Sequence, residues 1–178
     1  MYQRILVPVD GSSTSQRGLD EAINLARLTQ GRLRLIHVID ELSFALTADA
    51  YAGMAGNLLD TLRENAQRLL DDARSAALAA GVEADTVLCD TLSGAVHEMV
   101  TAEAAKWPAD VIVLGTHGRR GVGRLVLGSS AEHILRFAPV PVLLVRAPES
   151  PAKPEQAGEP TRVSLPAGAL AMERAGAT

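Results

Sequence analysis

The densest group of chemistry-bearing residues is a glycine-rich segment, residues 115–130, which reads GTHGRRGVGRLVLGSS. Glycine lets the backbone approach an anion closely and turn its amides toward it. A helix that starts at the end of such a segment adds unpaired amides and a partial positive charge. The composition therefore predicts a phosphate cradle, and the alternative is a glycine-rich surface loop with solvated arginines.

Polar side chains inside this segment extend the same hypothesis. Ser129 and Ser130 lie at the predicted helix start and supply hydroxyl donors. Arg119, Arg120 and Arg124 can supply positive charge, although for each arginine taken singly a solvated position is the favoured interpretation. His117 can donate to a phosphate or serve as a turn residue.

Two familiar phosphate-binding motifs do not fit the segment. Residues 123–130 have the glycine spacing of a Walker A loop, but Ser129 stands where that motif needs its lysine. Residues 121–126 begin like a dinucleotide fingerprint, but Val126 occupies the third glycine position and the segment follows the fourth predicted strand. A conventional P-loop ATPase and an NAD enzyme are both disfavoured.

The elements that must position the segment alternate along the chain. Short apolar runs predict buried parallel strands, and apolar residues at helical spacing predict helices between them. This alternation indicates an α/β fold with a single doubly wound parallel sheet and right-handed crossovers. The predicted strands are 4–10, 33–39, 82–90, 111–115 and 140–145, with helices after Ser12 or Ser13 and at 58–77, 95–106 and 130–137.

Helix ends and helix faces have local signals of their own. Ser12 or Ser13 is the expected N-cap of the first helix, and Gly31 is expected to end it as a left-handed cap. In the last helix we expect Ile134 and Leu135 to turn inward.

Length and charge restrict the class of protein. The chain has 178 residues and a net charge of −4, which suits one domain with a tail and disfavours general nucleic-acid binding. No apolar run reaches the roughly 18 residues of a membrane span, and the N-terminus has no signal-peptide pattern. We therefore expect a cytoplasmic protein without membrane contact. Cys89 is the sole cysteine and is expected to be a buried strand residue.

Composition changes at two places. Residues 148–178 are rich in Pro, Ala, Glu and Gly without periodicity, which predicts a flexible C-terminal tail after a domain at 1–147. Within the tail, residues 163–172 are apolar enough to dock on a neighbour. Residues 42–57 predict either a lid over the site or a short packed helix.

Several segments resemble the universal stress protein family, specifically its ATP-binding branch. That branch is marked by G-x2-G-x9-G-[ST], and Gly115, Gly118, Gly128 and Ser129 fall on this pattern. The segments 5–12, 35–38, 110–118 and 139–145 also look like the family, in the family's order. The resemblance covers about residues 1–147.

The resemblance implies a five-stranded, Rossmann-like sheet in order 3-2-1-4-5 and a nucleotide at the ends of strands one and four. Asp10, with Pro8 and Val9 beside it, would lie near the ribose and phosphates; the alternative for Asp10 is a helix-capping carboxylate. Val38 would hold adenine through backbone atoms, or serve only in core packing. The phosphates would be surrounded by Gly115, His117, Gly118, Arg119, Arg120, Gly128, Ser129 and Ser130.

By this resemblance the chain is a cytoplasmic regulatory module that binds ATP with Mg²⁺ and changes shape or protein partner with nucleotide state, with weak or no hydrolysis. One alternative is a magnesium-dependent nucleotide hydrolase or transferase in which Asp10 holds the metal. Another is a nucleotide-free dimeric interaction protein. The edge position and apolar character of strand five predict a homodimer through Val140 to Val145, and the alternative is a monomer whose edge the tail covers.

Overall fold

Five parallel strands form one sheet in the order β3-β2-β1-β4-β5, as expected. The computed structural model of the chain describes residues 1–39, 58–90, 94–116 and 127–146. The predicted tail and the segment 42–57 lie outside these residues. The strands are β1 Arg4–Pro8, β2 Arg32–Val38, β3 Ala84–Cys89, β4 Val111–Gly115 and β5 Val142–Val145.

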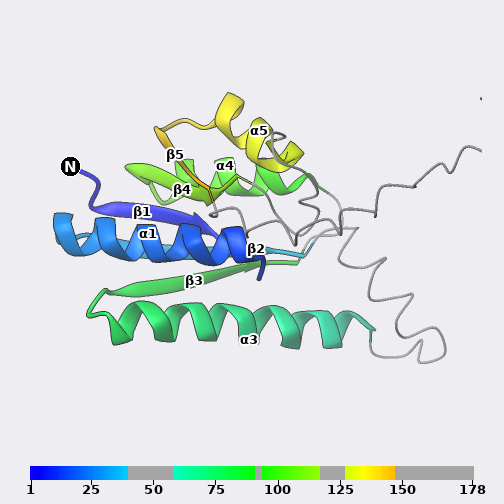
Figure 1. Ribbon diagram of the computed structural model, residues 1–178. Coiled ribbons are helices and arrows are strands. Elements are labelled where there is room, and N and C mark those ends of the chain that lie inside the picture. The colour runs from blue at the N-terminus through cyan, green and yellow to red at the C-terminus, as the bar shows by residue number, and fades with distance from the viewer. Residues whose placement is uncertain (40–57, 91–93, 117–126, 147–178) are drawn as a thin grey trace, which may run out of the picture. The chain divides into compact units, whose positions relative to one another are not determined.

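Helices cover both faces of the sheet (Figure 1). The helices α1 and α3 pack on one face, and α4 and α5 pack on the other. Of the helices in the described part of the chain, none is long and apolar enough to cross a membrane. Their bounds are α1 Ser13–Thr29, α3 Leu58–Ala79, α4 Val96–Lys106 and α5 Ser129–Phe137.

The central strand β1 shows why the apolar runs form buried strands. Successive side chains of a strand point to opposite faces, so a strand covered on both sides is apolar throughout. Ile5 and Val7 enter the core under α1 and α3, whereas Leu6 enters the core under α4 and α5. All three are fully buried.

The N-terminus of α1 begins as the sequence predicts, but its C-terminus differs from the prediction. Ser12 is the N-cap, and its hydroxyl oxygen accepts the N–H of Ser15 at 3.1 Å. The left-handed residue is Gln30, with φ of 54°, so the predicted left-handed cap at Gly31 is wrong. Gly31 is needed for another reason, because a Cβ there would lie 2.9 Å from the carbonyl oxygen of Gln3.

Some predicted boundaries and faces also shift. Strand β1 ends at Pro8 rather than at Asp10, and β5 begins at Val142 rather than at Val140. Pro141 has no N–H to donate, which explains the late start of β5. Ile134 is buried, but Leu135 is 48% exposed, so its expected inward position is wrong.

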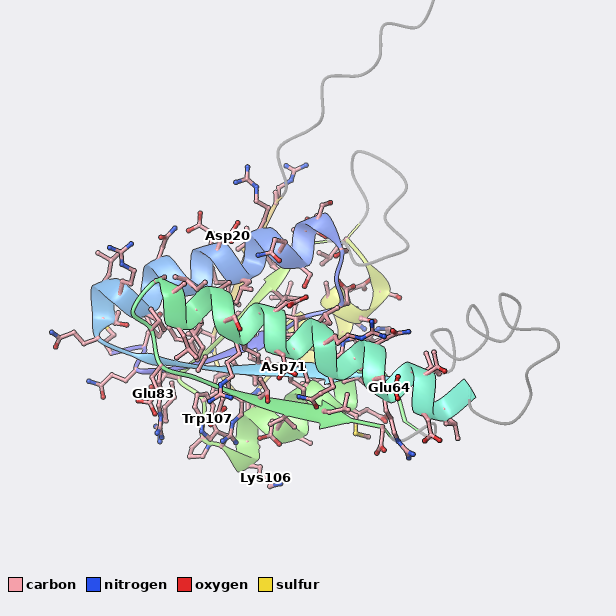
Figure 2. The ribbon with its side chains drawn as sticks, turned by 90° about the horizontal axis from the view of Figure 1, so that it is seen from below. Asp20, Glu64, Asp71, Glu83, Lys106 and Trp107 are labelled. Atoms are coloured by element: carbon pink, nitrogen blue, oxygen red, sulfur yellow. The ribbon has the colours of Figure 1, made fainter. Side chains whose placement is uncertain are left out.

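A charged cluster joins α4 to the sheet early in β2 and β3. The Arg34 guanidinium donates to both carboxylate oxygens of Asp85, at 2.8 and 2.7 Å, and to Glu103 at 2.8 Å. It also lies 4.6 Å from the centre of the Trp107 ring, which Figure 2 labels. The hydrogen bond to Asp85 raises the pKa of Arg34 above its usual value. Arg34 therefore links two strands and one helix.

Asp110 fastens the beginnings of β1 and β4. One carboxylate oxygen accepts the backbone N–H groups of Gln3 and Arg4, and the other accepts the Arg4 side chain at 3.2 Å. The side-chain hydrogen bond from Arg4 is the largest cause that lowers the pKa of Asp110. The carboxylate is thus held in its charged form.

Candidate functional site

The carboxyl ends of β1 and β4 lie side by side. The two strands pair in parallel, with Ile5 opposite Val111 and Leu6 opposite Ile112. The chain leaves β1 toward α1 on one face, and after β4 it reaches α5 on the opposite face. Such a reversal at the carboxyl edge of a parallel sheet is where α/β proteins hold ligands.

Asp10 organises the turn that leads from β1 into α1. One of its carboxylate oxygens accepts the N–H of Ser12 at 2.9 Å, and its own N–H donates to the Ser15 hydroxyl at 3.1 Å. Gly11 between them has φ of +80°, which favours glycine. Asp10 therefore shapes the turn, whereas the N-cap of α1 is Ser12. Contact of Asp10 with a ligand stays a prediction.

His37 holds the carbonyl of Val9, the last residue before Asp10. The imidazole Nδ1 lies 2.6 Å from the Val9 carbonyl oxygen, and the histidine is only 4% exposed. Because a carbonyl only accepts hydrogen bonds, Nδ1 must carry the proton. The next residue of β2, Val38, is buried on the opposite face.

Gly115 at the end of β4 is required for close packing against α1. A Cβ on Gly115 would lie 2.6 Å from the carbonyl carbon and oxygen of Thr14. A Cβ on Gly18, one turn further along α1, would lie 3.2 Å from the Gly115 nitrogen. The first turn of α1 is therefore held directly against the end of β4.

A backbone hydrogen bond joins the two described ends of the glycine motif. The N–H of Gly128 donates to the carbonyl oxygen of Thr116 at 2.9 Å, and the N–H of Thr116 donates to Val145 at 2.9 Å. Thr116 is buried at 8% exposure, while Ser129 and Ser130 are exposed. The bond brings Gly115 and the start of α5 to one place.

The start of α5 differs from that of α1. Gly128 is its N-cap, and no side chain caps it among the described residues, whereas Ser12 caps α1. The first amides of a helix without such a cap suit an anion, because they are donors at the positive end of the helix dipole. Ser129 and Ser130, the first two residues of α5, can add hydroxyl donors to these amides.

Four predicted ligand residues lie outside the described part of the chain: His117, Gly118, Arg119 and Arg120. Of the remaining ones, Gly115, Gly128, Ser129 and Ser130 come together at the ends of β4 and α5, and the residues from Pro8 to Asp10 lie at the adjoining end of β1. Sequence reasoning missed Thr116, although its place between motif residues was a signal.

The other two described histidines pair with each other. The rings of His97 on α4 and His133 on α5 stack with centroids 4.6 Å apart, and Phe137 stacks beside them. Nδ1 of His133 lies 2.7 Å from the carbonyl oxygen of Ser129. Within residues 1–39, 58–90, 94–116 and 127–146, no group of three or more metal-ligating side chains could hold a metal ion.

Cys89 lies beside the candidate site, opposite Val38 in the β2–β3 pairing. The side chain is half-buried rather than fully buried as expected. Burial is the largest cause that raises the pKa of its thiol. The thiol is therefore protonated near neutral pH and is a poor nucleophile.

A groove of about 470 Å³ lies on the α1 and α3 face beside the β1–α1 turn. Val9, Gly11 and Ser15 line it from the turn, and Arg68 and Asp72 line it from α3. Figure 2 shows α1 and α3 over this face, with Glu64 and Asp71 labelled on α3. The lining of the groove mixes charged and apolar side chains, and neither kind dominates.

Comparison with known proteins gives one consistent family. The model of the universal stress protein family matches residues 1–146. Universal stress protein MJ0531 of Methanocaldococcus jannaschii is 33% identical over 150 residues, which cover 84% of this chain and 85% of the relative. Universal stress protein A homolog 1 of Coxiella burnetii is 35% identical over 144 residues, which cover 81% of this chain and 96% of the relative.

Solved structures show the same fold. Hypothetical protein MJ0577 is 25% identical, with a TM-score of 0.70 and coverage of 84% of this chain and 99% of that one. A universal stress protein from Archaeoglobus fulgidus, solved in complex with dAMP, is 23% identical with a TM-score of 0.60, covering 81% of this chain and 98% of that one. A further universal stress protein, solved in complex with cAMP, is 24% identical with a TM-score of 0.57, covering 83% of this chain and 98% of that one.

Proposed function

This chain belongs to the universal stress protein family, and from that premise we propose that it is a regulatory module that binds ATP with Mg²⁺. The nucleotide would lie across the carboxyl ends of β1 and β4. Its phosphates would be held by Gly115, Gly118, Gly128, Ser129 and Ser130, with His117, Arg119 and Arg120 close by, and its ribose by the residues from Pro8 to Asp10.

The hydrogen bond between Gly128 and Thr116 is the observation that carries this proposal. It joins the first and last parts of the G-x2-G-x9-G-[ST] pattern beside the amides of an α5 start that no described side chain caps. A phosphate suits this arrangement because backbone amides at a helix start are donors for anions. An adenine nucleotide is the class of ligand that two proteins of the same fold carry, dAMP in one and cAMP in the other.

Binding is favoured over hydrolysis. Hydrolysis needs a group that orients water near the terminal phosphate. One oxygen of the Asp10 carboxylate already accepts the Ser12 N–H, so that oxygen serves the turn. We therefore propose that nucleotide state changes conformation or protein partner in the cytoplasm, and that turnover is weak or absent.

The same protein would be a homodimer through β5. The sheet order places β5 at an edge, and no strand in the described part of the chain pairs with its outer side. Leu143 on this strand is 42% exposed. Pairing of β5 with its copy across a two-fold axis would satisfy both edges, because such an interface is self-complementary.

Mass analysis of the small molecules released from freshly purified, denatured protein tests the nucleotide proposal. We expect ATP or another adenine nucleotide from the native chain, and none from a folded Gly128→Val variant. A native preparation that releases none, and that afterwards fails to bind added ATP with Mg²⁺, would contradict the proposal and revive the nucleotide-free interaction protein.

A further inference from the structure

The backbone ladder between β1 and β2 stops one step before β2 ends. In β2, alternate residues bond toward β1: Arg32 donates to Gln3, and the Ile36 carbonyl accepts from Val9, each by backbone atoms. The next bond in this series would run from the Val38 N–H to the Val9 carbonyl oxygen. That bond is not made among the described residues.

The His37 side chain occupies the place of that missing bond. Its Nδ1–H donates to the Val9 carbonyl at 2.6 Å, from the face that α1 and α3 cover. A buried carbonyl needs a donor, and His37 supplies it in place of the backbone. By the alternation of the ladder, the Val38 N–H and carbonyl point to the β1 side of β2, and neither bonds to β1 among the described residues.

We propose that His37 is a positioning residue that sets the base specificity of the nucleotide site. By holding the Val9 carbonyl, it leaves the backbone N–H and carbonyl of Val38 to a ligand base. It also fixes the start of the turn that carries Asp10, so one buried side chain orients both flanks of the site. The inference rests on the proposed nucleotide function.

The chemistry of the base explains why this arrangement selects adenine. Adenine presents an acceptor at N1 beside a donor at its amino group, which complements one backbone N–H and one carbonyl. Guanine presents a donor at N1 beside an acceptor at O6, which is the reverse order. A site whose polar groups are already placed rejects a base with the wrong pattern, because those groups are then left unpaired.

Two substitutions of similar size separate the donor from the bulk of the side chain. The amide nitrogen of Asn lies near the position of the histidine Nδ1, so His37→Asn keeps a donor for Val9. His37→Leu fills similar space without one, and His37→Gln places its donor one bond too far. With Leu or Gln, the Val38 N–H becomes the nearest backbone donor for the Val9 carbonyl.

The test is a titration of nucleotide-stripped native protein and these variants with ATP and with GTP, each with Mg²⁺. We expect the native chain and His37→Asn to bind ATP about tenfold or more tightly than GTP. For His37→Leu and His37→Gln, we expect the affinities for ATP and GTP to differ by less than about threefold. Variants that bind with an unchanged ATP-to-GTP ratio overturn the inference. Since His37→Gln keeps a polar side chain, it serves if His37→Leu fails to fold.

Amide hydrogen exchange at Val38 gives a readout that needs no nucleotide. In stripped native protein and in His37→Asn this amide should exchange quickly, and in His37→Leu it should be protected by the Val9 carbonyl. Equal protection in all three proteins overturns the inference. If the native chain binds neither nucleotide, the proposed function fails, while the exchange result still decides the role of His37.

Discussion

The end of β4 and the first turn of α1 touch through Gly115 and Thr14, where a Cβ on the glycine would lie 2.6 Å from the Thr14 carbonyl oxygen. Real Cβ atoms do not come so close to backbone, so glycine is required by packing at this position. The two elements that flank the candidate site are thereby fixed to each other before any ligand binds.

Gly115→Ala should therefore lower the free energy of unfolding by about 1–3 kcal/mol, as overpacking does in a close-packed interior. It should also weaken ATP binding, because α1 must shift away from β4. Urea unfolding measures the first effect and titration the second. Gly81→Asn is the matched control: Gly81 has φ of +77°, which Asn tolerates, and open space around it. Equal stability of the two variants would contradict the packing argument.

Acid should weaken the Asp110 junction. The folded-state pKa of Asp110 lies below the usual value of about 3.9, so its contribution is complete above that pH and is lost as pH falls through the folded pKa. The stability difference between native chain and Asp110→Asn should be largest above about pH 5 and shrink toward pH 3. Urea unfolding over this pH range measures it, and a difference that is independent of pH would be inconsistent with the ion pair.

The Arg34 cluster allows a test with a built-in spectroscopic probe. Arg34→Met leaves the Glu103 carboxylate, which is 8% exposed, without its partner, and we expect a loss of about 3 kcal/mol. A second substitution, Glu103→Gln, should recover part of that loss. Trp107 is the sole tryptophan, so its emission reports the loss of the stacked guanidinium. A fully stable Arg34→Met protein would show that the cluster contributes little.

The proposed dimer predicts that a charge on the edge strand separates the chains. Leu143→Lys should give a monomer in light scattering, because two lysines would meet near the two-fold axis. Leu78→Lys is the control, since Leu78 is 50% exposed on α3, away from β5. Dimers of both variants would place the interface elsewhere. A native chain that is monomeric would contradict the proposed dimer.

Local patterns predicted the elements well, because β1, β4 and β5 consist mainly of apolar runs and the helices carry one apolar stripe. Serine at 12 or 13 was recognisable as a cap from its type and place, and the structure selects Ser12. The strand order could not be predicted from local patterns, because periodicity does not say which strands are neighbours. The correct order came from the family resemblance.

What could not be predicted depends on contacts between distant segments. The role of Gly31 depends on Gln3, and that of Gly115 on Thr14, so a glycine that looked like a cap or a phosphate ligand is needed for close packing. The pairing of His97 with His133 likewise requires the packing of α4 on α5. None of these contacts leaves a local signal in the sequence.

Binding of ATP to nucleotide-stripped protein tests the central claim most directly, with thermal unfolding as the measurement. At about 100 times the dissociation constant, ATP with Mg²⁺ should add about 2.7 kcal/mol and raise Tm by about 5–10 °C. Gly128→Val should remain folded and lose this shift, because its side chain would crowd the start of α5. A stripped native chain whose Tm does not move at millimolar ATP, or a Gly128→Val protein that responds like the native chain, would contradict the account.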